Sequence, residues 1–170
     1  MNILKLNMQL KEIAEKHGPF VAILIGPPLS GKDTVLRQLD VDFRVICRDD
    51  ILLDVHGSDD YTRAYKEVNQ KKVDELLNKS LVDGGNSEDN CIVNMTNMGT
   101  KRRKHNLSFF KNHYKVAIIF PILEDKEYER RNAKRQEEES KFIPMYVIKR
   151  MIGQYQPIAE DEGFDKVISL

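Results

Sequence analysis

The chain has 170 residues, of which 41% are hydrophobic, and its 27 Lys and Arg residues balance its 27 Asp and Glu residues. This size and apolar content suit one compact domain, residues 1–170, and the charge balance excludes attraction to nucleic acid by net charge, so any such contact would be local. No stretch approaches the ~20 apolar residues of a membrane span, and the first ten residues lack an export signal, so we expect no membrane association.

Apolar runs of strand length alternate along the chain with segments of helical pattern. Residues 4–17 predict an amphipathic helix, and residues 20–25 are the kind of short apolar run that makes a buried parallel strand. The further predicted strands are residues 43–47, 91–95, 114–120 and 166–170, and the further predicted helices are residues 34–39, 60–82, 101–112, one from residue 124 and one over residues 144–155. This alternation predicts an α/β fold of three layers, in which a parallel sheet of four to five strands carries helices on both faces and ligands bind beyond the carboxyl ends of the strands.

A glycine-rich stretch follows the first predicted strand and reads Gly26-Pro-Pro-Leu-Ser30-Gly31-Lys32-Asp33-Thr34. Between a strand and a helix, the pattern G-x-x-x-x-G-K is typical of a P-loop, in which backbone N–H groups surround phosphate oxygens. The glycines permit the turn, and the lysine reaches the terminal phosphates. The sequence therefore predicts binding of ATP, or another nucleoside triphosphate, by Gly26, Ser30, Gly31, Lys32, Asp33 and Thr34.

Asp33 occupies the position at which a P-loop ordinarily places a Ser or Thr hydroxyl on Mg²⁺. Because Mg²⁺ accepts one or two carboxylates beside waters and phosphate oxygens, Asp33 is a candidate metal ligand, directly or through a water. The alternative is that Asp33 is only an acid in the first turn of a helix, where the helix dipole favours it.

Polar residues follow the second and third predicted strands, at the edge of the sheet where the P-loop lies. Arg48-Asp49-Asp50 ends the second strand, and Asp49 is the candidate general base that would accept a proton from an incoming hydroxyl. We interpret Asp50 as an N-cap or first-turn acid of the helix that follows. Thr96 and Asn97 follow the third predicted strand. Two roles stay open for them, contact with the substrate or a turn and N-cap before the next helix, and both roles can hold together.

Two basic clusters complete the candidate site. Lys101-Arg102-Arg103-Lys104 lies in the first turns of a helix, where cations oppose the dipole, and it indicates either a bound polyanion or a solvated face. Residues 130–135 form a basic helical segment before a polar stretch and a second helix, a pattern that indicates a lid at residues 130–145. Closing this lid would bring Arg131 and Arg135 onto a transferring phosphoryl group. The alternative is Glu–Arg pairing along an exposed helix.

Taken in order, these segments resemble the 5′-hydroxyl polynucleotide kinases of bacteriophage, within the wider group of small P-loop kinases. The resemblance spans residues 20–155 and rests on the P-loop, Arg48-Asp49-Asp50, Thr96-Asn97 with Lys101-Arg102-Arg103, Arg131 to Arg135, and residues 143–151. It implies a P-loop kinase fold with a helical lid, ATP and Mg²⁺ as cofactors, and transfer of the γ-phosphate to the 5′-hydroxyl end of RNA or DNA. It also implies Asp49 as general base, Lys32 and Arg135 as stabilisers of the transition state, and substrate contacts from Arg48, Asp49, Thr96, Asn97, Arg102 and Arg103.

Three positions depart from the pattern of that family. Leu52 stands where the family has an arginine that contacts an acceptor phosphate, Met95 replaces an Asp before the Thr-Asn pair, and Asp33 replaces the Ser of the P-loop. Two alternatives therefore stay open: a kinase for a nucleoside, a nucleotide or another small hydroxyl acceptor, and a nucleotide-binding module with little turnover.

The two cysteines, Cys47 and Cys91, form no pattern and fall inside predicted strands, as small core residues of a protein in a reducing compartment do. We therefore expect a cytoplasmic protein, in the host cytoplasm if a phage encodes it. The sequence carries no signal for an oligomeric state.

Overall fold

The computed structural model describes residues 2–139 and 141–170. The strands in this part of the chain are β1 (Phe20–Ile25), β2 (Arg44–Ile46), β3 (Cys91–Val93), β4 (Tyr114–Ile119) and β5 (Lys166–Ser169). They form one sheet in the order β2-β3-β1-β4-β5, and every neighbouring pair is parallel. The α/β fold class predicted from the alternation of strands and helices is therefore confirmed.

Helices connect the strands. They are α1 (Ile3–His17), α2 (Lys32–Leu36), α3 (Arg48–His56), α4 (Tyr61–Glu67), α5 (Gln70–Gly85), α6 (Thr100–Leu107), α7 (Asp125–Glu139) and α8 (Met145–Gly153), with a short 3₁₀ helix, η1 (Glu160–Glu162). The single helix predicted at residues 60–82 is two, because Val68 has an extended backbone and Asn69 caps α5 by accepting a hydrogen bond from the Lys71 N–H. This break allows α4 to turn away from α5.

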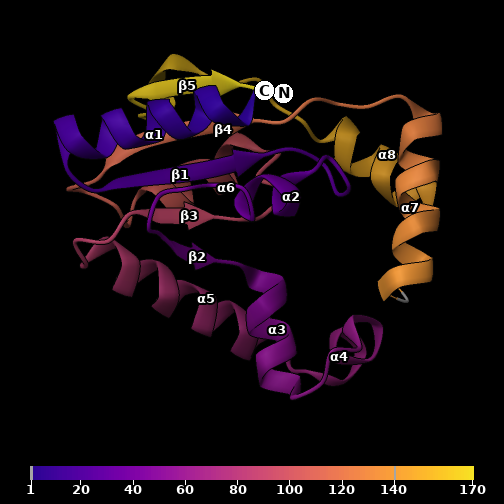
Figure 1. The fold of residues 1–170 in the computed structure, drawn as a ribbon. Helices are drawn as coiled ribbons and strands as arrows, with labels where there is room; N and C mark the ends of the chain where they lie inside the picture. Colours follow the sequence, from indigo (N-terminus) through magenta and orange to yellow (C-terminus); the bar gives the residue numbers. More distant parts are fainter. Residues whose placement is uncertain (1, 140) are drawn as a thin grey trace.

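Helices cover both faces of the sheet, as Figure 1 shows. The apolar side chains of α1 and α2 pack with alternate residues of β1, such as Phe20 and Leu24, in one buried cluster. The other residues of β1, such as Val21 and Ile25, pack with α5 and α6 in a second cluster. All six residues of β1 are buried, as expected for a central parallel strand whose two faces both carry helices.

The carboxyl ends of the strands point toward the side of the molecule where α7 and α8 lie (Figure 1). The chain leaves β1 there through the glycine-rich loop, and it leaves β2 there through α3. In the described residues, no helix is long and apolar enough to cross a membrane. The edge of the sheet at which ligands are expected therefore carries the loop before α2, the start of α3 and the pair of helices α7 and α8.

Candidate active site

The loop between β1 and α2 has a backbone that few sequences can adopt. Leu29 and Gly31 have φ angles of 62° and 101°, in the left-handed region. A Cβ atom on Gly26 would lie only 2.7 Å from the Cβ of Phe120, which follows β4. The Gly26 N–H donates to the carbonyl of Thr96 beyond β3, at 3.0 Å. The loop is thus held between the ends of β3 and β4, with the turn geometry that directs N–H groups at phosphate oxygens.

Lys32 begins α2 and turns its amine back over this loop. Its Nζ donates to two carbonyl oxygens of the loop, at 2.7 and 3.0 Å. Burial lowers the pKa of Lys32 to about 8, although the negative charges of Asp33 and Asp49 raise it. The positive charge of Arg135 also lowers this pKa. These three residues therefore lie within electrostatic reach of the lysine that would bind the terminal phosphates.

Asp50 lies in the first turn of α3, as predicted. The helix begins earlier than predicted, at Arg48, so Asp49 also lies in its first turn and not at the end of the strand. Asp49 is exposed and accepts a hydrogen bond from the hydroxyl of Tyr61 on α4, at 3.2 Å. Burial raises the pKa of Asp50, and the charges of Asp33 and Asp49 raise it further. The carboxylates of Asp33, Asp49 and Asp50 are thus within electrostatic reach of one another beside the P-loop, and the charge of Asp49 also raises the pKa of Lys32.

Asn94 fixes the orientation of Asp33. Its Nδ2 donates to the Asp33 Oδ1 at 2.8 Å, and its own N–H donates to Ile46 at the end of β2, at 2.9 Å. No role was predicted for Asn94, because it fell inside the predicted strand at residues 91–95, whereas β3 ends at Val93 and Asn94 follows it directly. One carboxylate beside phosphate oxygens and water is a ligand set that Mg²⁺ accepts, so Asp33 fits the role of magnesium ligand.

Over residues 2–139 and 141–170, no group of three or more His, Cys, Asp or Glu side chains is arranged to hold a metal ion by itself. A Mg²⁺ ion at Asp33 would therefore depend on the oxygens of a bound triphosphate and on water for its remaining ligands.

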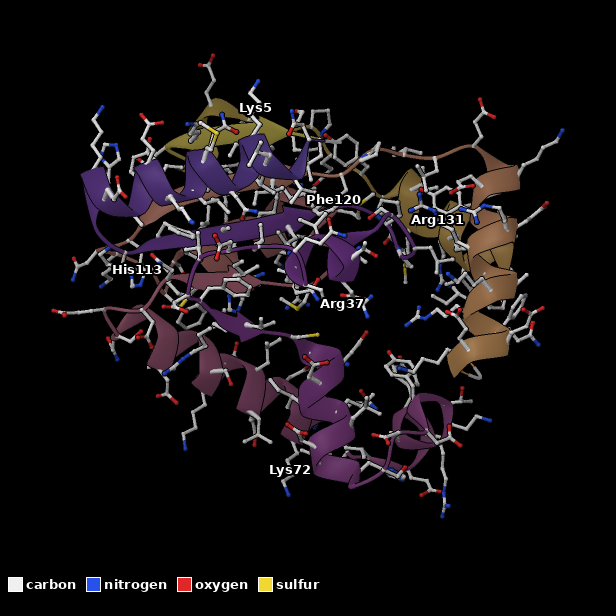
Figure 2. All side chains as sticks on the ribbon, in the orientation of Figure 1. Lys5, Arg37, Lys72, His113, Phe120 and Arg131 are labelled. Carbon is white, nitrogen blue, oxygen red and sulfur yellow. The ribbon has the colours of Figure 1, made fainter. Side chains whose placement is uncertain are left out.

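Helix α7 reaches the P-loop through Arg131, whose Nη1 donates to the carbonyl of Leu29 at 2.9 Å. Figure 2 shows Arg131 on the side of α7 that faces this loop. Glu127, one turn earlier, holds the Nε of Arg131 at 2.6 Å and also pairs with Arg130. These hydrogen bonds lower the pKa of Glu127 to about 2. The Glu–Arg pairing along the helix and the approach of an arginine to the phosphate site are therefore both present.

Helices α7 and α8 are joined as a hairpin by a buried amide. Asn132 donates its Nδ2 to the carbonyl of Ile143 at 2.6 Å and accepts the N–H of the same residue at 3.1 Å. Pro144 then caps α8, at the position where the sequence predicted that a helix starts. The hairpin covers most of the predicted lid segment, residues 130–145, of which residue 140 lies outside the described chain.

Arg103 is not available to a substrate, which corrects its predicted role. Its side chain is fully buried and forms two hydrogen bonds of 2.7 Å with Glu162 of η1. Its remaining donors reach carbonyl oxygens, including those of Met98 and Gln156, both at 2.9 Å. Lys104 pairs with Asp161 at 2.6 Å. In the basic segment at residues 101–104, Arg102 stays exposed beside Lys101 and remains a candidate for contact with a polyanion.

Asn97 is likewise a structural residue rather than a helix cap. It is buried with a φ of 47°, its Nδ2 donates to the carbonyl of Leu24 at 2.8 Å, and its Oδ1 accepts from Asn106 at 3.0 Å. The cap of α6 is Gly99, which contributes no side-chain hydrogen bond. Asn97 therefore braces the ends of β1 and β3 against α6, and because its side chain is buried it is not available to a ligand.

The other predicted residues are placed as follows. Arg48 turns toward α5, where it binds Asp74 at 2.9 Å and Gln70 at 2.8 Å. Thr96 is half-buried beside the P-loop, Thr34 is exposed on α2, and the buried Ser30 has its hydroxyl 3.4 Å from the Lys32 amine. The site thus brings together the P-loop residues, Asp49, Arg131 and Arg135, while Arg48, Asn97 and Arg103 serve the scaffold.

A family model described as AAA domain matches residues 21–158. A chain of the Pnkp1/Rnl/Hen1 RNA repair complex is 20% identical, with a TM-score of 0.66 over 88% of this chain and 50% of that one. Kti12 of Chaetomium thermophilum in complex with ADP-AlF3 is 16% identical, with a TM-score of 0.62 over 88% of each chain. Shikimate kinase of Aquifex aeolicus is 19% identical, with a TM-score of 0.51 over 88% of this chain and 86% of that one. No curated protein matches the sequence.

At these identities the solved structures establish a shared fold. The chain spans about half the length of the chain that it matches in the RNA repair complex, 50% by coverage. The arrangement of parallel strands, P-loop and flanking helices is that of a P-loop kinase-like domain.

Proposed function

The chain belongs to the AAA domain family and has a P-loop kinase-like fold, and we propose that it transfers the γ-phosphate of ATP, or of another nucleoside triphosphate, to the 5′-hydroxyl end of a polynucleotide, RNA or DNA. The observation that supports phosphotransfer best is the grouping of charged side chains at the P-loop. The Lys32 Nζ lies over two loop carbonyls at 2.7 and 3.0 Å, Asn94 orients Asp33 at 2.8 Å, and Arg131 reaches the Leu29 carbonyl at 2.9 Å. Asp49 and Arg135 are close enough for their charges to shift the pKa of Lys32. This grouping combines a phosphate-binding amine, a metal ligand, a base and a second cation, which are the parts that phosphoryl transfer uses.

Each of these groups has a task in the reaction. The loop N–H groups and Lys32 hold the phosphates, and a bound Mg²⁺, held at Asp33, would neutralise their charge. Asp49 accepts the proton of the acceptor hydroxyl as that oxygen bonds to the γ-phosphorus and the bond from phosphorus to the β-phosphate oxygen breaks. Arg131 and Arg135 stabilise the negative charge that the transferring group presents to α7.

Support for a polynucleotide acceptor comes from the order of the matching segments along the chain and from the likeness to a chain of an RNA repair complex. The exposed Arg102 and Lys101 stand at the start of α6, beyond the carboxyl end of β3, and offer cations for backbone phosphates.

A kinase for a small hydroxyl acceptor is the second candidate, and one observation favours it. Leu52 is fully buried in the cluster that joins α3, α4 and α5, so this position of α3 cannot contact an acceptor phosphate. Shikimate kinase, a small-molecule kinase, also has a similar fold.

A panel of acceptors separates the two candidates. The protein is incubated with γ-labelled ATP and Mg²⁺ in the presence of a 5′-hydroxyl oligonucleotide, the same oligonucleotide already carrying a 5′-phosphate, a nucleoside mixture, or water alone. The proposal expects label on the 5′-hydroxyl oligonucleotide and none on its 5′-phosphorylated control. Label on nucleosides only supports the small-acceptor kinase, and label released to water only, or no turnover, contradicts both.

A further inference from the structure

Helix α4 packs against α3 and α5, below α7 in the view of Figure 1. Buried Leu52, Ala64 and Val73 form a small apolar cluster that joins α3, α4 and α5. Gln70 donates to the carbonyls of Tyr65 and Val68, at 2.8 and 3.3 Å. The same Gln70 accepts a hydrogen bond from Arg48 at 2.8 Å. The C-terminal end of α4 is therefore fixed relative to the start of α3, where Asp49 lies.

Two tyrosines of α4 extend outward from the catalytic carboxylate. The hydroxyl of Tyr61 donates to the Asp49 Oδ1 at 3.2 Å, which leaves the other carboxylate oxygen for an acceptor hydroxyl. Tyr65, one turn later, stacks on Tyr61 with ring centroids 6.1 Å apart and an angle of 28° between the rings. Tyr61 is half-buried, whereas Tyr65 is 54% exposed.

The geometry of this pair suits a planar ring as ligand. A rigid aromatic side chain loses little conformational entropy when a second ring stacks on it, and an offset stack is the favoured arrangement. In a nucleic acid the terminal 5′-hydroxyl and its base are joined through one sugar. A terminal nucleotide whose hydroxyl lies at Asp49 can therefore direct its base toward the tyrosines of α4.

We propose that Tyr61 and Tyr65 form a stacking site for the base of the acceptor's terminal nucleotide, so that the acceptor is a base-bearing 5′-hydroxyl nucleoside or nucleic acid end. This inference rests on the proposed function, because it assigns one part of the acceptor to a surface beside the proposed base. Stacking needs a ring and no particular hydrogen-bond pattern, so the site accepts all four bases.

The test compares an oligonucleotide with a normal 5′-terminal nucleotide and the same oligonucleotide with an abasic 5′-terminal residue. Steady-state phosphorylation of both is measured with the wild-type protein and with Tyr65→Ala, Tyr65→Phe and Thr62→Ala, the last being an exposed position of the same helix. For the base-bearing acceptor we expect Tyr65→Ala to raise KM about 5- to 150-fold with kcat little changed, since loss of one base–aromatic stack has about that effect. Tyr65→Phe and Thr62→Ala should match the wild type.

For the abasic acceptor, Tyr65→Ala should have the same KM as the wild type. An equal change in KM for both acceptors, or no change for either, would overturn the stacking site. If the wild-type protein phosphorylates no oligonucleotide, the proposed polynucleotide kinase activity is wrong, and this result is distinct from a failure of the stacking site.

Equilibrium binding then decides the stacking site independently of turnover, through the anisotropy of the same two oligonucleotides labelled at the 3′ end. The stacking site is supported if the wild type binds the abasic form more weakly than the base-bearing form and if Tyr65→Ala binds the base-bearing form as weakly as the wild type binds the abasic form. Equal binding of both forms by the wild type contradicts the site.

Discussion

Binding of a triphosphate should draw a proton onto Lys32. Burial lowers the pKa of this amine to about 8, so at pH 8 about half of the free protein carries the amine uncharged. A bound triphosphate favours the charged form, because opposite charges in close contact raise the pKa of an amine. Binding at pH 8 should therefore be accompanied by uptake of about half a proton.

The same linkage sets the pH dependence of affinity. If only the charged amine binds well, its fraction falls from about three quarters at pH 7.5 to about one tenth at pH 9, so the affinity for ATP should fall about eightfold over this range. Phosphate groups with a second pKa of about 6 are already fully charged in this pH range and do not contribute. The direction follows from the lowered pKa of Lys32, since affinity is lost as the pH rises through the pKa of the free protein.

Isothermal titration calorimetry measures both quantities, with ATP titrated in two buffers of different ionisation enthalpy. The matched control is Lys32→Arg, whose guanidinium stays charged throughout this range, so its proton uptake should vanish and its affinity should be flat with pH. A wild-type protein with the same apparent enthalpy in both buffers and a constant affinity from about pH 7.5 to 9 would refute this account of Lys32.

Three further predictions concern individual side chains. Asp33→Asn should raise the Mg²⁺ concentration needed for half-maximal activity, whereas Asp33→Ser should largely preserve the activity. If Asp33→Ala has the same Mg²⁺ dependence as the wild type, Asp33 is only an acid at the start of a helix. Arg131→Ala should lower kcat/KM, measured from initial rates, about 10²-fold, because it removes the cation that donates to the Leu29 carbonyl and stabilises the transferring group. Unchanged rates would show that Arg131 of α7 takes no part in catalysis. Arg103→Met should lower the free energy of unfolding by about 3–5 kcal/mol in urea titrations because Glu162 is left buried and unpaired, whereas Lys104→Ala in the exposed pair with Asp161 should change it little.

The alternation of apolar runs was sufficient to predict the fold, and the glycine-rich loop was sufficient to predict the turn between β1 and α2, because both signals are local in sequence. The boundary errors have local physical causes as well. Asn69 caps a new helix within the predicted segment at residues 60–82, and Arg48-Asp49-Asp50 starts α3 directly after a strand of three residues.

The misassigned site residues depended on distant partners that no local pattern reveals. Arg103 finds its buried acid, Glu162, 59 positions later in the chain, and Asn97 donates to Leu24, 73 positions earlier. In sequence alone, a basic residue at the start of a helix indicates a ligand contact as readily as an ion pair. The contact of Tyr61 with Asp49 also required the structure, since it crosses the turn between α3 and α4.

The proposed phosphotransfer depends on Asp49 as the base that accepts the proton of the acceptor hydroxyl, so Asp49→Asn is the decisive variant. The variant and the wild type are compared for ATP dissociation constant by calorimetry and for γ-phosphate transfer to a 5′-hydroxyl oligonucleotide in a single turnover. For Asp49→Asn we expect an ATP affinity within about twofold of the wild type and a transfer rate lower by about 10²–10⁴, the usual contribution of a general base. A wild-type transfer rate in Asp49→Asn would contradict this role of Asp49.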